Sequence, residues 1–440
     1  MSTIRQKRKS NRFTIKNIKK QLPEMHDIHG YKVFLYPFPN KTVYVEMYNN
    51  NGFISETKET SGINHLLEHV LTNAWKKCKH NKCSPYWTER GVSYNASTSE
   101  TLLNYYTYGL EEYSREMLDY IINITINPVI TQKMIENEHT AVQNELLREL
   151  NKRNSSLYDK FNKEFYSLEG LQYSADWKLQ IDNLKKIKKE TILDTFKEYY
   201  HSRNTVFMVS GDFNKKQVLD IFKKYIKPKH KTLCPVNPFS SKPCFSNNNK
   251  VIHLQDIGSK TVHMLIGFPT DIDVSHPLFY SVGMSMEIIQ NILFEHLRTK
   301  LKLVYGISVT AVTNSCGVSI HIEVFVNDKS APKVLTEIVK KIELYKKQIL
   351  PNKQYIAITK KQKLNYRNFK LGPIVLASHF MNQYMIQVHK QHKKLYTIDQ
   401  QLDILSKVTK ENIRSIYNII FDFKKVLIVY QSKQRISLRI

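Results

Sequence analysis

A His-x-x-Glu-His pattern, formed by His65, Glu68 and His69, constrains the possible fold more than any other stretch of this chain. On a helix, residues four positions apart lie on the same side, so the two imidazoles can share one metal ion. Glu68 would lie beside them, where a carboxylate can accept a proton from water activated by that ion. The order is the reverse of the commoner His-Glu-x-x-His motif. The pattern predicts a metal site carried by a helix.

The residues around this pattern predict the helix itself. Apolar residues recur at helical spacing and form one stripe, made of Ile63, Leu66, Leu67, Val70, Leu71 and Ala74. Ser61 precedes the stripe and is the predicted N-cap. Given the content of His and Glu, the pattern would arise by chance with a likelihood of roughly 3%. A third ligand is therefore needed to decide whether a metal site is present.

The order of the predicted elements indicates two related domains. The chain has 440 residues, which is enough for two or three domains. Strand, strand, helix, strand, helices and strand follow one another twice, on either side of a Pro- and Ser-rich linker at 228–249. We therefore predict an α+β fold of two duplicated sandwich domains, at 29–227 and 250–440, each a mainly antiparallel sheet packed with helices. His-x-x-Glu-His occurs only in the first.

A carboxylate is expected to complete the site, because a catalytic zinc ion commonly takes two histidines, one carboxylate and an open position. The helix predicted over 131–153, with Thr131 as its N-cap, offers four glutamates: Glu136, Glu138, Glu145 and Glu149. Glu138 and Glu145 are seven residues apart and share one face of that helix. Either one can be the ligand and the other its partner, and spacing alone does not choose between them.

The combination resembles the pitrilysin/insulinase family of zinc peptidases, which includes mitochondrial processing peptidase. That family pairs His-x-x-Glu-His with a downstream glutamate ligand and has a further glutamate seven positions before it. Here 75 residues separate His69 from Glu145, as the family pattern requires, and Glu138 stands seven positions before Glu145. The resemblance implies that Glu145 is the metal ligand and that Glu138 assists catalysis.

Two further stretches carry the resemblance. Residues 91–98, which read Gly-Val-Ser-Tyr-Asn-Ala-Ser-Thr, are similar to the strand on which this family lays its substrate, and this implies substrate contacts at Asn95 and Ala96. Arg298 and Tyr305, seven positions apart, resemble a pair in the second domain that holds the substrate backbone. The chain departs from the family pattern at Val92, in place of a glycine, and at residues 72–75, which read Thr-Asn-Ala-Trp.

The resemblance implies a zinc-dependent metalloendopeptidase with one Zn²⁺ per chain. Its expected metal ligands are His65, His69 and Glu145. Glu68 would accept a proton from the attacking water, and Arg298 and Tyr305 would hold the substrate carbonyls. A peptide or an unfolded protein segment would add as a β-strand beside Asn95 and Ala96. Short chains of this family pair into a clamshell, so we expect a homodimer, or a heterodimer with a related chain.

The net charge of +27 supports a rival interpretation. Residues 1–28 form a predicted basic arm, and residues 1–23 hold eight basic side chains and no acidic one. A charge of this size attracts nucleic acid and anionic surfaces. The alternative is therefore a non-catalytic nucleic-acid-associated or virion protein that retains the fold. No nucleic-acid-binding motif supports it, and no apolar run in the sequence reaches the length of a membrane span.

Cysteine usage predicts a reducing intracellular compartment, such as the cytoplasm, a virion or the mitochondrial matrix. Five scattered cysteines are too few for a disulfide framework. Cys78 and Cys83 are expected to be free thiols, the alternative being a separate metal site at residues 78–83. Cys234 and Cys244 are expected to be unpaired.

Overall fold

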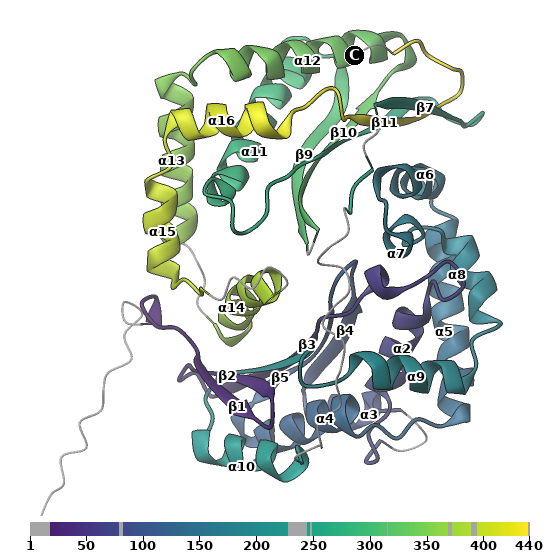
Figure 1. Cartoon of the computed structure of the whole chain (residues 1–440), viewed down its shortest axis with the longest axis vertical. Helices are drawn as coiled ribbons and strands as arrows, with labels where there is room; N and C mark the ends of the chain where they lie inside the picture. The colour runs from purple at the N-terminus through teal and green to yellow at the C-terminus, as the bar shows by residue number, and fades with distance from the viewer. Residues whose placement is uncertain are drawn as a thin grey trace, which may run out of the picture.

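Figure 1 shows the computed structural model of the chain, which describes residues 18–78, 82–227, 244–246, 249–314, 316–367, 372–388 and 394–438. Each half of the chain forms one lobe around its own sheet. Residues 1–17 of the predicted arm, most of the predicted linker and Cys234 lie outside the described residues. No helix of the described part is long and apolar enough to cross a membrane.

The sheet of the first lobe has six strands: β1 (Glu24–Ile28), β2 (Tyr31–Pro37), β3 (Thr42–Asn49), β4 (Ser93–Thr98), β5 (Leu103–Leu110) and β6 (Thr205–Gly211). Their order is β1-β2-β6-β3-β5-β4, and only β2 and β6 run parallel. In the central strand β3, Val43, Val45 and Met47 belong to the main core of this lobe, because alternate side chains share one face. β4 is an edge strand of this sheet.

The sheet of the second lobe repeats this topology. Its strands are β7 (Lys250–Gln255), β8 (Val262–Pro269), β9 (Val304–Asn314), β10 (Gly317–Val326) and β11 (Leu427–Ser432). Their order is β7-β11-β8-β10-β9, and only β7 and β11 run parallel. In both lobes the last strand is inserted between the first and second strands of the repeated unit, with β1 as an addition to the first. The prediction of two duplicated α+β sandwiches is confirmed.

Helices cover both sheets. Those of the first half are α2 (Ile63–Thr72), α3 (Ser84–Thr88), α4 (Ser114–Ile126), α5 (Gln132–Leu150), α6 (Ser155–Phe165), α7 (Glu169–Gln172), α8 (Trp177–Leu184), α9 (Lys189–Tyr199) and α10 (Lys215–Tyr225). Those of the second half are α11 (Phe279–Leu293), α12 (Ala331–Lys347), α13 (Asn352–Arg367), α14 (Pro373–Val388), α15 (Ile398–Ser406) and α16 (Lys410–Ile420). α11 is followed without a break by a π-helical segment, Phe294–Lys300.

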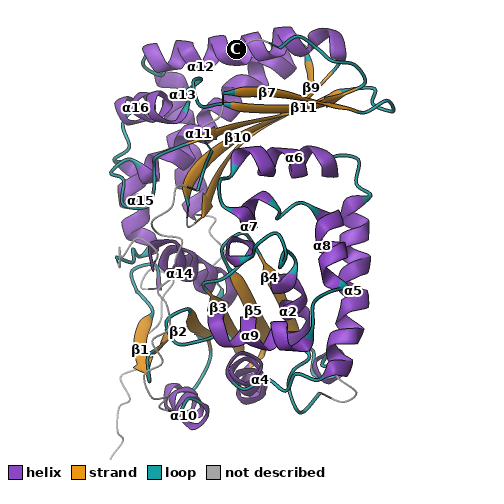
Figure 2. Cartoon of the chain, turned by 45° about the vertical axis from the view of Figure 1, so that its right-hand side comes forward, coloured by secondary structure: helices purple, strands orange, loops and turns teal. Residues whose placement is uncertain are grey.

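The two lobes exchange helices. α14 from the second half packs on β2, β3 and β6 of the first sheet, and α6 from the first half packs on β8 and β11 of the second sheet (Figures 1 and 2). Phe161 and Phe165 of α6 lie against Gly267 of β8, where an added Cβ atom would lie 2.4 Å from the Phe161 ring. The close approach of this helix to the second sheet therefore depends on a residue without a side chain.

Two disulfides overturn the predictions for three cysteines. Cys78 is bonded to Cys83, and Cys244 is bonded to Cys316. Cys78 and Cys83 are thus neither free thiols nor ligands of a separate metal site, and Cys244 is paired. Spacing did not indicate the second bond, because 72 positions separate its cysteines and only the fold brings their Cα atoms to 5.5 Å.

Candidate metal centre

The helix that carries the His-x-x-Glu-His pattern, α2, is fixed by its apolar face. Leu66, Leu67, Val70 and Leu71 are fully buried in the core of the first lobe. Burial of such side chains contributes roughly 1.5–3 kcal/mol each. His65 and His69 lie on the opposite, partly exposed side of the helix. The helical spacing thus separates the packing residues from the candidate ligands, as the sequence predicts.

The predicted N-cap of α2, Ser61, is wrong. Gly62 is the N-cap residue, with a left-handed backbone at φ +97° that favours glycine. The carboxylate of Glu56 instead accepts hydrogen bonds from the backbone N–H groups of Gly62 and Asn64, each at 2.9 Å. Burial raises the pKa of Glu56 to about 8, although these hydrogen bonds oppose the shift. The side chain of a glutamate from the preceding loop therefore accepts the hydrogen bonds of the first backbone N–H groups of α2.

Three side chains converge on one point. The Nε2 atoms of His65 and His69 lie 3.4 Å and 3.6 Å from the same carboxylate oxygen of Glu145. One ligand atom from each of the three side chains lies within 4.8 Å of the others, and no other such group of three occurs among the described residues. Two imidazole nitrogens and one carboxylate oxygen form the donor set of a catalytic zinc site. The residues present therefore fit a zinc ion.

The helix α5 supplies both glutamates that the sequence left as alternatives. Thr131 caps it as predicted, accepting a hydrogen bond from the Met134 N–H at 3.2 Å. Glu145 approaches the Nε2 atoms of both histidines, whereas Glu138 lies 3.4 Å from Nδ1 of His69. A carboxylate on the second ring nitrogen orients a metal-binding histidine. The structure thus gives the two glutamates different positions around the ligands.

Burial and local charge set the protonation of the cluster. Burial, with the neighbouring His69, lowers the pKa of His65 to about 4. Burial also acts on His69, but its hydrogen bond with Glu138 and the negative charges of Glu68, Glu145 and Glu138 outweigh it and raise its pKa. Burial raises the pKa of Glu68 as well. His65 is thus neutral near pH 7, which leaves its ring a free lone pair for a metal ion.

Glu68 is held by the edge strand β4. Thr98 Oγ1 donates a 2.6 Å hydrogen bond to Glu68 Oε2, and this bond opposes the rise of the Glu68 pKa. Thr98 ends the stretch at 91–98, and its bond to Glu68 could not be predicted from the sequence, because only the fold brings β4 against α2. Asn95 and Ala96, predicted to contact substrate, line the same cavity of about 630 Å³ as the metal cluster.

Two predicted site residues are not brought to this cavity. Arg298 and Tyr305 are absent from its lining. Arg298 donates to the backbone carbonyl of Val304, and Tyr305, at the start of β9, is 59% exposed. Within one chain, the second-domain pair therefore does not contribute to the candidate metal centre.

The duplicated fold and the His–His–Glu cluster on an inverted His-x-x-Glu-His helix define the class of inverted-motif zinc peptidases and their relatives. Residues 33–175 match the family described as insulinase (peptidase family M16), and residues 186–363 match the peptidase M16 inactive domain. The chain belongs to the insulinase family, M16.

The curated relatives found by sequence similarity match less than half of this chain. The probable zinc protease PqqL of Haemophilus influenzae is 26% identical over 189 residues, which are 41% of this chain and 20% of that protein. The mitochondrial-processing peptidase subunit beta of Dictyostelium discoideum is 24% identical over 174 residues, 39% of this chain and 37% of that protein. The chain thus spans less than half the length of these curated relatives.

The fold is shared more widely than the sequence. A protease from Helicobacter pylori has a TM-score of 0.81 to this structure at 18% identity, covering 93% of this chain and 100% of the other. At this identity the likeness concerns the fold alone, and it extends across both lobes.

Proposed function

We propose that this protein is a zinc-dependent metalloendopeptidase with one zinc ion per chain, held by His65, His69 and Glu145. The observation that carries the proposal is the convergence of these side chains beside Glu68, in a cavity bordered by an edge strand. A zinc ion in such a site polarises the scissile carbonyl and lowers the pKa of water towards ~7. The chain's own residues supply the remaining functions.

Glu68 is the proposed general base. It accepts a proton from the attacking water and later returns it to the leaving amine. Glu68 is only 8% exposed, and burial raises the pKa of its carboxyl, which favours its action as a proton acceptor. The Thr98 hydrogen bond holds one of its oxygens, Oε2, in place. Glu138 is proposed to assist by orienting His69.

The substrate is proposed to be an extended peptide segment. β4 pairs with β5 on one side and is the outer strand of its sheet. An extended peptide can therefore add to its free edge through backbone hydrogen bonds, which read side chains weakly. Asn95 and Ala96 lie on this strand and line the cavity, so such a peptide would pass the metal cluster.

A second chain is proposed to complete the site. Arg298 and Tyr305 lie outside the cavity of their own chain but belong to the motif that holds substrate carbonyls in the family. A homodimer would place this pair of each chain at the metal centre of the other. The similarity to a protein named as a peptidase subunit makes a heterodimer with a related chain the other arrangement.

The test compares Glu68→Gln with wild type in two measurements, zinc content and cleavage of a peptide library. The variant should keep about one zinc ion per chain, while its cleavage rate falls by ~10²–10⁴-fold, the usual contribution of a general base. Glu149→Gln is the matched control, because Glu149 lines the same cavity but pairs with Lys152. Full activity of Glu68→Gln would refute the mechanism. Salt-sensitive nucleic-acid binding by a wild-type chain that cleaves nothing would favour the non-catalytic alternative.

A further inference from the structure

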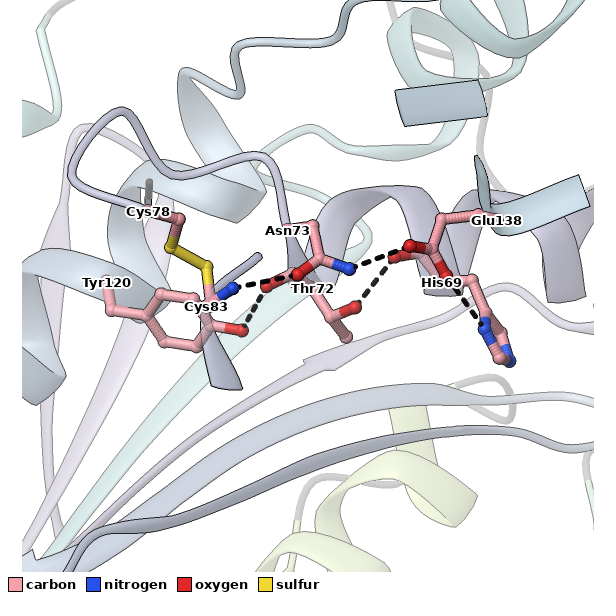
Figure 3. Close-up of a disulfide and its surroundings, with 7 residues drawn as sticks. All are labelled: His69, Thr72, Asn73, Cys78, Cys83, Tyr120 and Glu138. Atoms are coloured by element: carbon pink, nitrogen blue, oxygen red, sulfur yellow. Dashed lines mark hydrogen bonds and ion pairs between the residues drawn. A yellow bond between two sulfur atoms is a disulfide. The ribbon is translucent and has the colours of Figure 1, made fainter. Parts of the chain in front are cut away.

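A chain of hydrogen bonds connects a disulfide to a candidate metal ligand (Figure 3). The backbone N–H of Cys83, which is bonded to Cys78, donates to Asn73 Oδ1 at 3.0 Å. Asn73 Nδ2 donates to Glu138 Oε1, also at 3.0 Å. The other oxygen of Glu138 lies 3.4 Å from Nδ1 of His69. The side chain of Asn73 is the link between the disulfide-closed loop and Glu138.

The two bonds of Asn73 fix its orientation. A side-chain amide has one oxygen, which accepts, and one nitrogen, which donates. Because the loop amide of Cys83 occupies the oxygen, the nitrogen is directed towards Glu138. Asn73 directly follows α2, and its own backbone N–H bonds to carbonyls of that helix, so the side chain is free for this role. The pair is also partly shielded from water, since the Glu138 side chain is only 17% exposed.

The loop is anchored on both sides. Cys83 is fully buried, and Trp75 and Trp87 stack across the base of the loop with ring centroids 5.5 Å apart. The disulfide also joins Cys83 to Cys78. The Cys83 N–H therefore presents a fixed donor to Asn73, and opening the disulfide would loosen this donor without removing it.

We propose that Asn73 is a positioning residue that, held by the loop closed by Cys78–Cys83, fixes Glu138 against His69 and strengthens metal binding. This inference rests on the proposed zinc site. Removal of groups that orient a metal ligand typically lowers metal affinity by ~10–100-fold. Asn73 acts one step further from the ion, so the lower end of that range applies.

The test measures zinc affinity by competition with a chromophoric chelator, on the full chain. Asn73→Ala should weaken zinc binding by about tenfold, at the low end of that range. Cys78→Ser should weaken it less, because Cys83 stays buried. In a Glu138→Ala background, Asn73→Ala should have no further effect, since the bond it removes is already lost.

Two controls separate positioning from helix stability. Tyr120 OH donates to the carbonyl of Thr72 at the same end of α2 but makes no contact with Glu138. Tyr120→Phe should therefore lower the melting temperature and leave zinc affinity unchanged. Cys244→Ser opens the other disulfide and should likewise leave zinc affinity unchanged.

The outcomes distinguish this inference from the proposed function. A wild-type chain that binds no zinc refutes the proposed metal centre. Tight zinc binding that is equal in wild type and in folded Asn73→Ala refutes the positioning role alone. Additive effects of Asn73→Ala and Glu138→Ala, or a loss of affinity in Tyr120→Phe as large as in Asn73→Ala, would also refute it.

Discussion

The buried carboxyl of Glu46 makes the stability of this protein depend on pH. Glu46 lies at the centre of β3, on the face packed by α14, and is 1% exposed. Its Oε1 accepts a 2.8 Å hydrogen bond from Asn104. Burial nevertheless raises its pKa from 4.5 to about 7. The two values are about 2.5 pH units apart, so ionising Glu46 costs the folded state about 3 kcal/mol, at ~1.4 kcal/mol per pH unit.

The sign follows from the higher pKa in the folded state. Between pH 4.5 and about 7 the folded chain binds this proton more tightly than the unfolded chain. The contribution of Glu46 to the free energy of unfolding is therefore fully present below pH 4.5 and is lost as the pH rises through about 7. Glu46→Gln keeps the hydrogen bond with Asn104 but cannot ionise. As the pH is raised from 4.5 to 8, the free energy of unfolding of the variant should increase by about 3 kcal/mol relative to that of wild type.

Urea unfolding followed by circular dichroism measures this difference. Both proteins are measured with chelator present, so that pH-dependent metal binding does not contribute. Other buried acids, such as Glu56, act equally in both proteins and cancel. Glu136→Gln is the control, because that side chain is exposed and its removal should not change the pH dependence. An equal stability difference between wild type and Glu46→Gln at pH 4.5 and pH 8 would refute the reasoning.

Three further predictions concern the metal centre. Thr98→Val removes the hydrogen bond to Glu68 and should lower kcat/KM by ~10-fold or more with zinc content unchanged, since bonds to charged groups contribute ~1.5–3 kcal/mol; steady-state kinetics and metal analysis check this. Chelation should lower the melting temperature of wild type but not that of His65→Ala, because only a bound ion adds stability. Mixing equal amounts of inactive Arg298→Ala and Glu68→Gln chains should restore about a quarter of wild-type activity. Half of the randomly formed dimers then contain one chain of each variant, and each such dimer has one intact site of two. No recovery would contradict sites shared between chains.

The repeated order of strands, the helices that bear ligands and the His–His–Glu set could be predicted because each depends on local spacing. The face of α2 follows from a 3.6-residue period, and the cap of α5 follows from Thr131. Glu138 and Glu145 could not be told apart by spacing, since both lie on one face of α5. Only the angle at which α5 crosses α2 shows that Glu145 meets both Nε2 atoms.

The features that escaped prediction depend on contacts between distant segments. Glu56, and not Ser61, accepts the hydrogen bonds at the start of α2, where Gly62 has a positive φ and separates Ser61 from the helix. The bond between Cys244 and Cys316 joins the end of the predicted linker to the turn between β9 and β10. The packing of α6 on the second sheet and of α14 on the first sheet likewise could not be predicted from the periodicity of the sequence.

The metal helix is held by side chains from four separate segments. The Glu56 carboxylate accepts a hydrogen bond from the backbone N–H of Gly62 at the start of α2, and the Tyr120 hydroxyl donates to the carbonyl of Thr72 at its end. Thr98 is hydrogen-bonded to Glu68, and Glu138 contacts the ring of His69. Each of these contacts is made by the polypeptide alone, and the apolar face of α2 is buried independently of any ion. We therefore expect the ligands to be preorganised, so that zinc binding orders few additional groups. Loss of zinc should therefore lower the melting temperature without unfolding the first lobe, in contrast to small zinc domains that fold only with their metal.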